Sequence, residues 1–379
     1  MTGKQNKQQP VNIGTLSQTI RATGFVLENR VATILKSAGW TVISNKYYVD
    51  DLDDKVREID LIAYKVADVQ GFDSYTCIII SCKKSEADYW AFLSREAALL
   101  DPNFEWRPLH AWTNVPAMKY QLAGIGIGAR YHDELAKLGV QEVVRQPASE
   151  VFAFQEMKRS TGAPNNDATI FLSITSLIKA QAYELGALPA RKKSPCVYQF
   201  NLVTVVDAEL VKLQFKGEEI QSQQIEQVDY FSRYIVKKNE SFARIRFLNA
   251  EKFSGALKDY DRLHLANITW FGQQCDLFYK GILGDAKRWM LLKAEFLEAF
   301  GRQVRPIFRK MHRSSLDLSD IFFSFDDQNN HVEIMIKGSD EEIKYLNEND
   351  KAKNLAANAL KLIYRFTGTF NFAIDDIPF

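Results

Sequence analysis

Acids and a lysine occur in two neighbouring stretches of the sequence at spacings that suit shared chemistry. In residues 57–64, Glu58 and Asp60 alternate with apolar residues, so a strand here places both carboxylates on one face. In the β-branched run that follows, Ser81 and Lys83 share a face. Carboxylates bind hard divalent cations, which acidify a bound water and neutralise phosphate charge. An ammonium beside them orients that water or holds the phosphate, so the pattern favours phosphodiester hydrolysis.

A helix followed by a strand is predicted just upstream, over residues 22–43. Its apolar stripe at helical spacing consists of Leu27, Val31, Ile34, Leu35 and Ala38. Thr23 is the expected N-cap and Gly39 the expected end of the helix. Glu28 lies beside the stripe, at the boundary of the core.

This order of elements resembles the core of the PD-(D/E)xK nuclease superfamily: a helix with a glutamate, a strand with an aspartate, and a strand with a lysine. The Glu-Ile-Asp-Leu-Ile-Ala motif is similar to the Holliday-junction-resolvase-like and Mrr-like branches. The resemblance covers residues 24–84, under a fifth of the chain. It implies a restriction-endonuclease-like α/β fold, a mixed sheet flanked by helices. It also implies an Mg²⁺- or Mn²⁺-dependent endonuclease that leaves 5′-phosphate and 3′-hydroxyl ends.

The resemblance assigns roles to three residues: Asp60 matches the metal-binding aspartate, Lys83 the catalytic lysine, and Glu28 the helix glutamate. Ser81 departs from the pattern, because the family has Glu or Gln at this position and a hydroxyl is a weaker ligand for a hard cation. Glu58 would supply the second carboxylate as a metal ligand, or Glu86 or Asp88 would fold back into the site. The alternative is a catalytically silent nuclease-like domain that binds nucleic acid or assembles a complex.

The composition is that of an ordinary folded protein. The chain has 379 residues, of which 46% are hydrophobic, and this is enough for two or three domains. The formal net charge of +1 gives no general argument for a polyanionic partner, so any basic surface must be local. No apolar run is long enough for a membrane span and no signal region is present, so we expect a cytoplasmic protein without membrane contact. The four cysteines have no C-x-x-C spacing, which argues against zinc.

The expected domains are a disordered tail over residues 1–19, a nuclease-like domain over 20–190, and a C-terminal α/β region over 191–379. The last would serve recognition or regulation, and it divides near residue 280 if it holds two subdomains. Gly, Pro and basic residues in 186–195 have the composition of a linker.

Outside the site, five expectations bear on the fold. We predict a helix over residues 87–100, a strand over 140–144, and two strands over 197–215 joined by a hairpin turn at 206–209. A hairpin over 321–337 and one helix over 340–365 are expected near the C-terminus.

A basic helix is predicted over residues 285–305, with Pro306 kinking or restarting it. Arg302, Arg305 and Arg309 fall on one side of this helix and predict a contact with a nucleic-acid backbone or with the acids of a protein partner.

The sequence thus predicts a metal-dependent nuclease acting on nucleic acid, DNA more than RNA, in phage defence, restriction or repair. A larger complex with a protein partner, or a homo-oligomer, is a further expectation. Size-exclusion chromatography tests it.

Overall fold

The computed structural model describes residues 13–50, 54–236, 238–312, 317–318 and 321–375. The chain divides into two compact units, Met1–Val115 with Ile125–Phe271, and Pro116–Gly124 with Gly272–Phe379. Each is described by itself.

The first unit is built on a mixed sheet, which has nine strands in the described residues. The main order is β1-β2-β3-β6-β9-β8, with β4 and β7 on β6 and β5 on β3. The β3–β6 and β6–β9 pairs are parallel and the other pairs antiparallel. The strands are β1 (Thr41–Val49), β2 (Val56–Val69), β3 (Phe72–Glu96), β4 (Ala111–Thr113), β5 (Ser149–Lys158), β6 (Cys196–Lys216), β7 (Glu219–Ile225), β8 (Gln227–Val236) and β9 (Asn239–Asn249).

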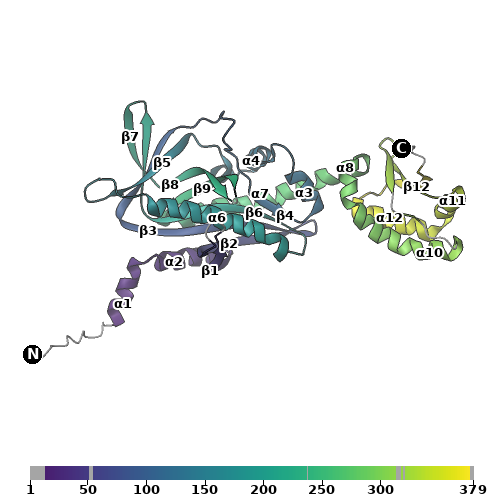
Figure 1. Ribbon diagram of the computed structural model, residues 1–379, viewed down its shortest axis with the longest axis horizontal. Helices are drawn as coiled ribbons and strands as arrows, with labels where there is room; N and C mark the ends of the chain where they lie inside the picture. The colour runs from purple at the N-terminus through teal and green to yellow at the C-terminus, as the bar shows by residue number, and fades with distance from the viewer. Residues whose placement is uncertain (1–12, 51–53, 237, 313–316, 319–320, 376–379) are drawn as a thin grey trace, which may run out of the picture. The chain divides into compact units, whose positions relative to one another are not determined.

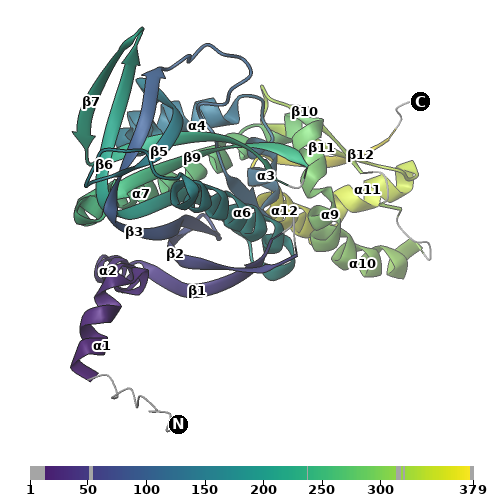
Figure 2. The ribbon, with the colours of Figure 1, turned by 60° about the vertical axis from the view of Figure 1, so that its left-hand side comes forward.

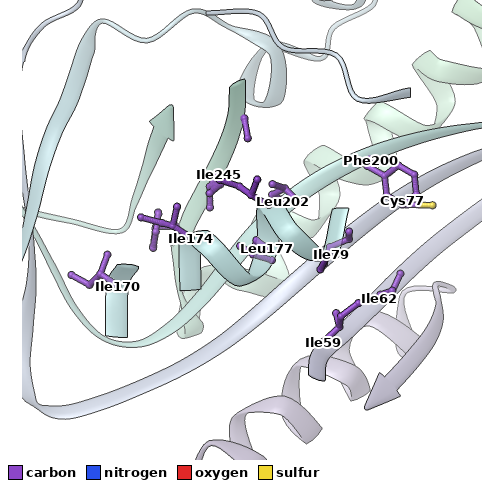
Figure 3. Close-up of a cluster of buried hydrophobic side chains, with 14 of the residues drawn as sticks. Ile59, Ile62, Cys77, Ile79, Ile170, Ile174, Leu177, Phe200, Leu202 and Ile245 are labelled. Atoms are coloured by element: carbon purple, nitrogen blue, oxygen red, sulfur yellow. The ribbon is translucent and has the colours of Figure 1, made fainter. Parts of the chain in front are cut away.

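One face of this sheet is covered by the long helix α6 (Ala168–Arg191), as Figure 1 shows. The helix contributes Ile170, Ile174 and Leu177 to an apolar core. Figure 3 shows these side chains against those of four strands, namely Ile59, Ile62, Cys77, Ile79, Phe200, Leu202 and Ile245. Burial of these branched side chains explains why β-branched runs form central strands here.

The other face packs against α7 (Phe253–Tyr279), which begins in the first unit and ends in the second. Thr76 accepts a hydrogen bond from Asn267 of α7, whereas its neighbour Cys77 belongs to the core beneath α6. Successive residues of a strand point to opposite faces, so the two helices lie on opposite sides of the sheet.

Helix α2 (Gly24–Ser37) carries the first of the predicted site residues and packs against β1, β2 and β3. Leu27, Val31 and Leu35 of the predicted stripe are buried. Thr23 occupies the N-cap position, but its hydroxyl donates to the Ile20 carbonyl and does not cap the helix. Gly39 follows the helix with φ +79°, a conformation that suits glycine.

The helix predicted over residues 87–100 is wrong, because β3 continues through Glu96. Tyr89–Ser94 pairs with β6 on one side and β5 on the other, and Trp90 and Phe92 are 0% exposed. An apolar cluster in a short segment suits either a helix or a buried strand, and pairing on both sides decides for the strand.

Two further predictions are corrected. The expected hairpin turn at 206–209 does not exist, because β6 runs through it with Val206, Ala208 and Leu210 buried on one face. The expected strand over 140–144 is instead the short helix α5 (Gln141–Val144), which follows α4 (Ile127–Lys137).

The chain divides elsewhere than the sequence suggested. The sheet continues across the boundary predicted near residue 190, since β6 pairs with β3 along most of its length. The observed division comes at Gly272, nearer to the predicted split at 280. Of the predicted disordered tail, residues 1–12 lie outside the described part, while Ile13–Thr19 forms helix α1, followed by a 3₁₀ turn at Ile20–Ala22.

The second unit has a small sheet and an aromatic core. Its described strands β10 (Phe322–Asp326) and β11 (His331–Ile336) form the predicted hairpin, and β12 (Thr369–Ile374) joins β11 in parallel. Its helices are α3 (Pro116–Leu122), α8 (Ala286–Trp289), α9 (Lys293–Phe296), α10 (Arg302–His312), α11 (Asp340–Glu348) and α12 (Asp350–Tyr364). Rings of Phe296, Phe323 and Tyr364 contact one another in the core.

Two helical predictions in this unit need adjustment. The single helix expected over 340–365 is divided at Asn349, whose side chain accepts the N–H of Ala352 and caps α12. The restart expected at Pro306 is wrong, because Pro306 lies inside α10, and the helix predicted over 285–305 is instead divided before it into α8, α9 and a π-helical turn at Leu297–Gly301. Within the described ranges, no helix is long and apolar enough to cross a lipid bilayer.

Candidate active site around Asp60 and Lys83

The Asp60 carboxylate is the centre of the candidate site. The pairing of β2 with β3 ends at Leu61 opposite Ile80, and beyond that end Asp60 Oδ2 accepts the N–H of Cys82 at 2.7 Å. The same oxygen accepts the Ser81 hydroxyl at 3.2 Å and Lys83 Nζ at 3.3 Å. One carboxylate oxygen therefore holds three donors from three successive residues of β3. No described residue donates to its other oxygen, Oδ1.

Lys83 and Asp60 form a partly buried ion pair. Their side chains are 26% and 20% exposed, and no other acid of the described residues pairs with Lys83. Attraction between charges is stronger at a partly desolvated position than in open water. The carboxylate thus fixes the direction of the ammonium while leaving it accessible to a solvent-borne substrate.

Glu28 joins this group from α2 through its charge. Burial, the negative charge of Asp60 and, more weakly, that of Glu58 raise the pKa of the Glu28 carboxyl, while Lys83 opposes the shift. Glu28 has no hydrogen bond or ion pair with any residue that the structure describes. Its carboxylate therefore lies close to other negative charge, which the positive charge of Lys83 offsets only in part.

Glu58 lies on the same strand as Asp60, two residues earlier, and is exposed. Its Oε1 accepts a hydrogen bond of 2.6 Å from the Asn45 amide of β1, where Asn45 has φ +53°. Glu58 is thus at the rim of the site, held towards β1.

The two acids that would fold back into the site are engaged elsewhere. Glu86 is exposed and pairs with Lys84 at 2.6 Å. Asp88 is buried and accepts hydrogen bonds from Ser85 and Asn165. Neither takes the place that the family gives to the residue at Ser81.

Helix α6 closes one side of the site. A cavity of about 10 Å³ lies between Asp60 and Ser81 on the sheet and Ser176, Leu177 and Ala180 on α6. That volume is about the minimum for a single water. A nucleotide has no room there, so a substrate must approach from the exposed side of Lys83 and Glu28.

The donor set fits a divalent cation in part. No group of three or more His, Cys, Asp and Glu placed to hold a metal occurs in the part of the chain that the structure describes. The Ser81 hydroxyl already donates a hydrogen bond to Asp60, and serine has no carboxylate to bind a cation. Asp60 Oδ1 and the Glu28 carboxylate remain as ligands, with Glu58 at the rim. The negative charges of these carboxylates repel one another, and a bound cation would reduce that repulsion.

Two features of the site were not apparent from the sequence. The Cys82 N–H is a backbone donor to Asp60, and the pattern of side chains in the sequence does not indicate this hydrogen bond. The Cys82 thiol itself is buried beside Asp60 and Glu28, and burial followed by these charges raises its pKa. It is therefore a protonated thiol of the core and no nucleophile.

The predicted arginine stripe lies in the second unit, on α10. Arg302, Arg305 and Arg309 are exposed and, with Pro306, line a shallow hollow of about 530 Å³. None of the three forms an ion pair with another described residue, so three cationic groups face solvent together. Arg313, which follows them in the sequence, lies outside the described residues.

No protein-family model, no curated protein and no solved structure matches the chain. The argument for function therefore depends on the site itself.

Proposed function

We propose that this protein is a metal-dependent nuclease of the PD-(D/E)xK type that hydrolyses phosphodiester bonds in nucleic acid, DNA more than RNA. The observation that carries the proposal is the pairing of Lys83 Nζ with Asp60 Oδ2 at 3.3 Å, beside a glutamate from a preceding helix. The mixed sheet with flanking helices is compatible with the restriction-endonuclease-like fold, to which we assign the first unit as part of the same proposal.

In this proposal Asp60 and Glu28 hold Mg²⁺ or Mn²⁺, and Glu58 becomes the third ligand only by leaving its hydrogen bond with Asn45. When bound, the ion neutralises charge on the scissile phosphate and lowers the pKa of a water. Lys83 holds a phosphate oxygen or orients the attacking water, and Asp60 fixes the direction of that ammonium. Water adds to phosphorus and the bond to the 3′ oxygen breaks, which leaves 5′-phosphate and 3′-hydroxyl ends. A role in phage defence, restriction or repair belongs to the same proposal.

The first test is cleavage of plasmid DNA, single-stranded DNA and RNA with Mg²⁺ or Mn²⁺. We expect wild type to cut, and Asp60→Ala and Lys83→Ala each to lose at least about a hundredfold in rate, as groups of this kind contribute. Asp68→Ala, an exposed acid on the same strand, and Lys137→Ala, an exposed lysine of α4, are the matched controls and should cut normally. Undiminished cutting by Lys83→Ala would refute the assigned roles.

A second candidate function is a catalytically silent nuclease-like module that binds nucleic acid or assembles a complex. It is favoured by Ser81, which donates to Asp60 where the family supplies an acceptor, and by the missing third metal ligand among the described residues. Calorimetry with Mn²⁺ separates the two candidates. Heat of binding that disappears in Asp60→Ala supports the nuclease, whereas no binding at millimolar Mn²⁺ supports the silent module.

Ser81→Glu sharpens this comparison, because it restores the carboxylate that the resemblance expects. If the site holds a cation, the variant should bind Mn²⁺ more tightly than wild type. If the module is silent because its geometry is lost, Ser81→Glu leaves Mn²⁺ affinity unchanged.

A further inference from the structure

A wide groove lies at the far end of β3 and β6, away from Asp60. It has a volume of about 1220 Å³ and lies between the β6–β7 hairpin and the ends of β3 and β5. Figures 1 and 2 show this hairpin standing out from the rest of the first unit. The groove is large enough and open enough to admit a polymer chain.

Lys212 is the central cation of the groove. Its Nζ donates to the Ser149 hydroxyl at 2.7 Å, and it pairs with no acid of the described residues. A second hollow, of about 370 Å³, shares Lys212, Ser149 and Gln223 with the first, so the ammonium lies where the two meet. Lys212 is half-buried, and desolvation lowers its pKa. A partly buried cation without a counter-charge is costly, and a bound anion would offset that cost.

The remaining lining combines hydrogen-bond donors with apolar surface, to which Phe215 contributes. It includes the amides and hydroxyls of Gln214, Gln221, Ser222 and Gln223, and the ammonium of Lys216, which is exposed. Arg95 also lines the groove but is paired with Glu150, and Glu96 is an acid at the edge. Lysine, glutamine and serine side chains are the groups that proteins use to contact phosphate oxygens and sugars.

The groove and the candidate active site lie on the same face of the sheet. Val206 is the partner of Lys83 on β6, and Lys212 comes six residues further along the same strand. An even separation keeps both side chains on one face, and six residues of strand span about 20 Å. Ala208 and Leu210, which lie between them on that face, are buried, so a bound strand must pass over the covering residues. The direct distance of about six base pairs, at about 3.4 Å each, is therefore the minimum length that spans both places.

We propose that the groove around Lys212 binds the sugar–phosphate backbone of nucleic acid, as a second contact for the strand whose phosphodiester reaches Lys83. The inference rests on the proposed function for the identity of the polymer. It adds that the substrate is a chain long enough to span both places, and that Lys212 contributes to its affinity without taking part in the chemistry.

The test is binding of a labelled DNA duplex of about 20 base pairs, followed by fluorescence anisotropy with EDTA present so that nothing is cut. We expect Lys212→Ala and Lys212→Gln to weaken binding about tenfold, as for loss of a charged hydrogen bond. The slope of log affinity against log salt should become shallower by about 0.9. Lys212→Arg keeps the charge and should bind within a few-fold of wild type.

Lys137→Ala serves as the matched control, because it removes one positive charge from an exposed position on α4, outside the groove. It should change neither affinity nor salt slope appreciably, and circular dichroism verifies the fold of every variant. Binding by both neutral Lys212 variants that equals wild type in strength and salt slope overturns the inference. So does the absence of DNA binding by wild type, and polyglutamate binding that depends on Lys212 would then identify an acidic protein as the ligand.

The same variants distinguish this inference from the proposed function. If DNA binding depends on Lys212 but no DNA or RNA is cut, the inference that the groove binds nucleic acid is supported and the nuclease assignment fails. If DNA is cut and Lys212 variants bind and cut as wild type does, the nuclease assignment stands and the groove fails.

Discussion

At the scale of single residues, the site depends on how one carboxylate is used. Asp60 Oδ2 holds the Cys82 N–H, the Ser81 hydroxyl and Lys83 Nζ, so its direction is fixed by β3 before any ligand arrives. Such fixed groups lose little freedom when a substrate binds, which favours catalysis. Ser81 therefore helps to orient Asp60, although the family that the sequence resembles has Glu or Gln at this position.

Glu28 gives a prediction for pH dependence. Burial and the nearby charge of Asp60 raise its pKa in the folded protein, so the folded state favours the protonated form. Folding is consequently penalised as pH rises from the unfolded-state pKa through the higher folded-state pKa. We expect Glu28→Gln, which resembles protonated glutamate, to gain stability over wild type across that window and to keep the gain at neutral pH.

Urea unfolding at acidic and neutral pH checks this, with Glu86→Gln as the control at an exposed acid whose pKa is lowered by Lys84. For Glu86 the sign is opposite, because a lowered pKa stabilises the fold above the unfolded pKa and the benefit is lost as pH falls. A Glu28→Gln variant that is less stable than wild type at neutral pH would mean that Glu28 has a favourable partner, such as a bound cation.

At the scale of elements, β3 is the strand that positions the site and extends to the groove. It carries Ser81 and Lys83, pairs with β2 and β6 near the site, and pairs with β5 and β6 further on. Its register shifts between Lys84 and Tyr89, next to the candidate catalytic lysine. Irregularities of this kind redirect side chains and often lie beside functional sites.

The strand assignment of residues 87–96 leads to a prediction for stability. Phe92 is 0% exposed and packs against Phe247, so Phe92→Ala should lower the free energy of unfolding by about 3–5 kcal/mol. Leu100→Ala is the comparison, because Leu100 belonged to the same predicted helix but is 97% exposed. We expect it to change stability by less than about 0.5 kcal/mol. Chemical denaturation measures both, and equal small losses would contradict a buried strand.

At the scale of the whole molecule, each of the two units has a core of its own among the described residues. Apolar residues from α6 and the large sheet form one, and aromatic residues around Phe296 and Tyr364 form the other. The candidate active site and the Lys212 groove belong to the first unit, and the arginine stripe belongs to the second.

Two cores predict two unfolding transitions. A calorimetric scan should show Phe92→Ala lowering one transition temperature, and Phe296→Ala, at a residue 0% exposed in the second unit, lowering the other. Each variant should lower the free energy of unfolding by about 3–5 kcal/mol in one transition and leave the other transition unchanged. A single transition lowered equally by both variants would show that the units unfold together.

Local patterns in the sequence predicted much of the site. Alternation in β2 and β3 correctly predicted that Asp60, Ser81 and Lys83 meet, because the side-chain period of a strand is a local property. The apolar stripe of α2 likewise predicted its buried face and the boundary position of Glu28. The α/β class and the large mixed sheet, which the family resemblance implied, are also present.

Only the tertiary structure decided what depends on partners distant in sequence. Trp90 and Phe92 form a strand because β5 and β6 flank them, and β6 continues through residues 206–210 because β3 pairs with it before and after Ala208. The sheet therefore crosses the predicted domain boundary, and Lys212 comes to lie in a groove with residues of β5 and β7. In such segments the free energy gained by burial and strand pairing outweighs the local preference for helix, strand or turn. That free energy depends on residues distant in sequence, so the residues nearby in the chain do not predict it.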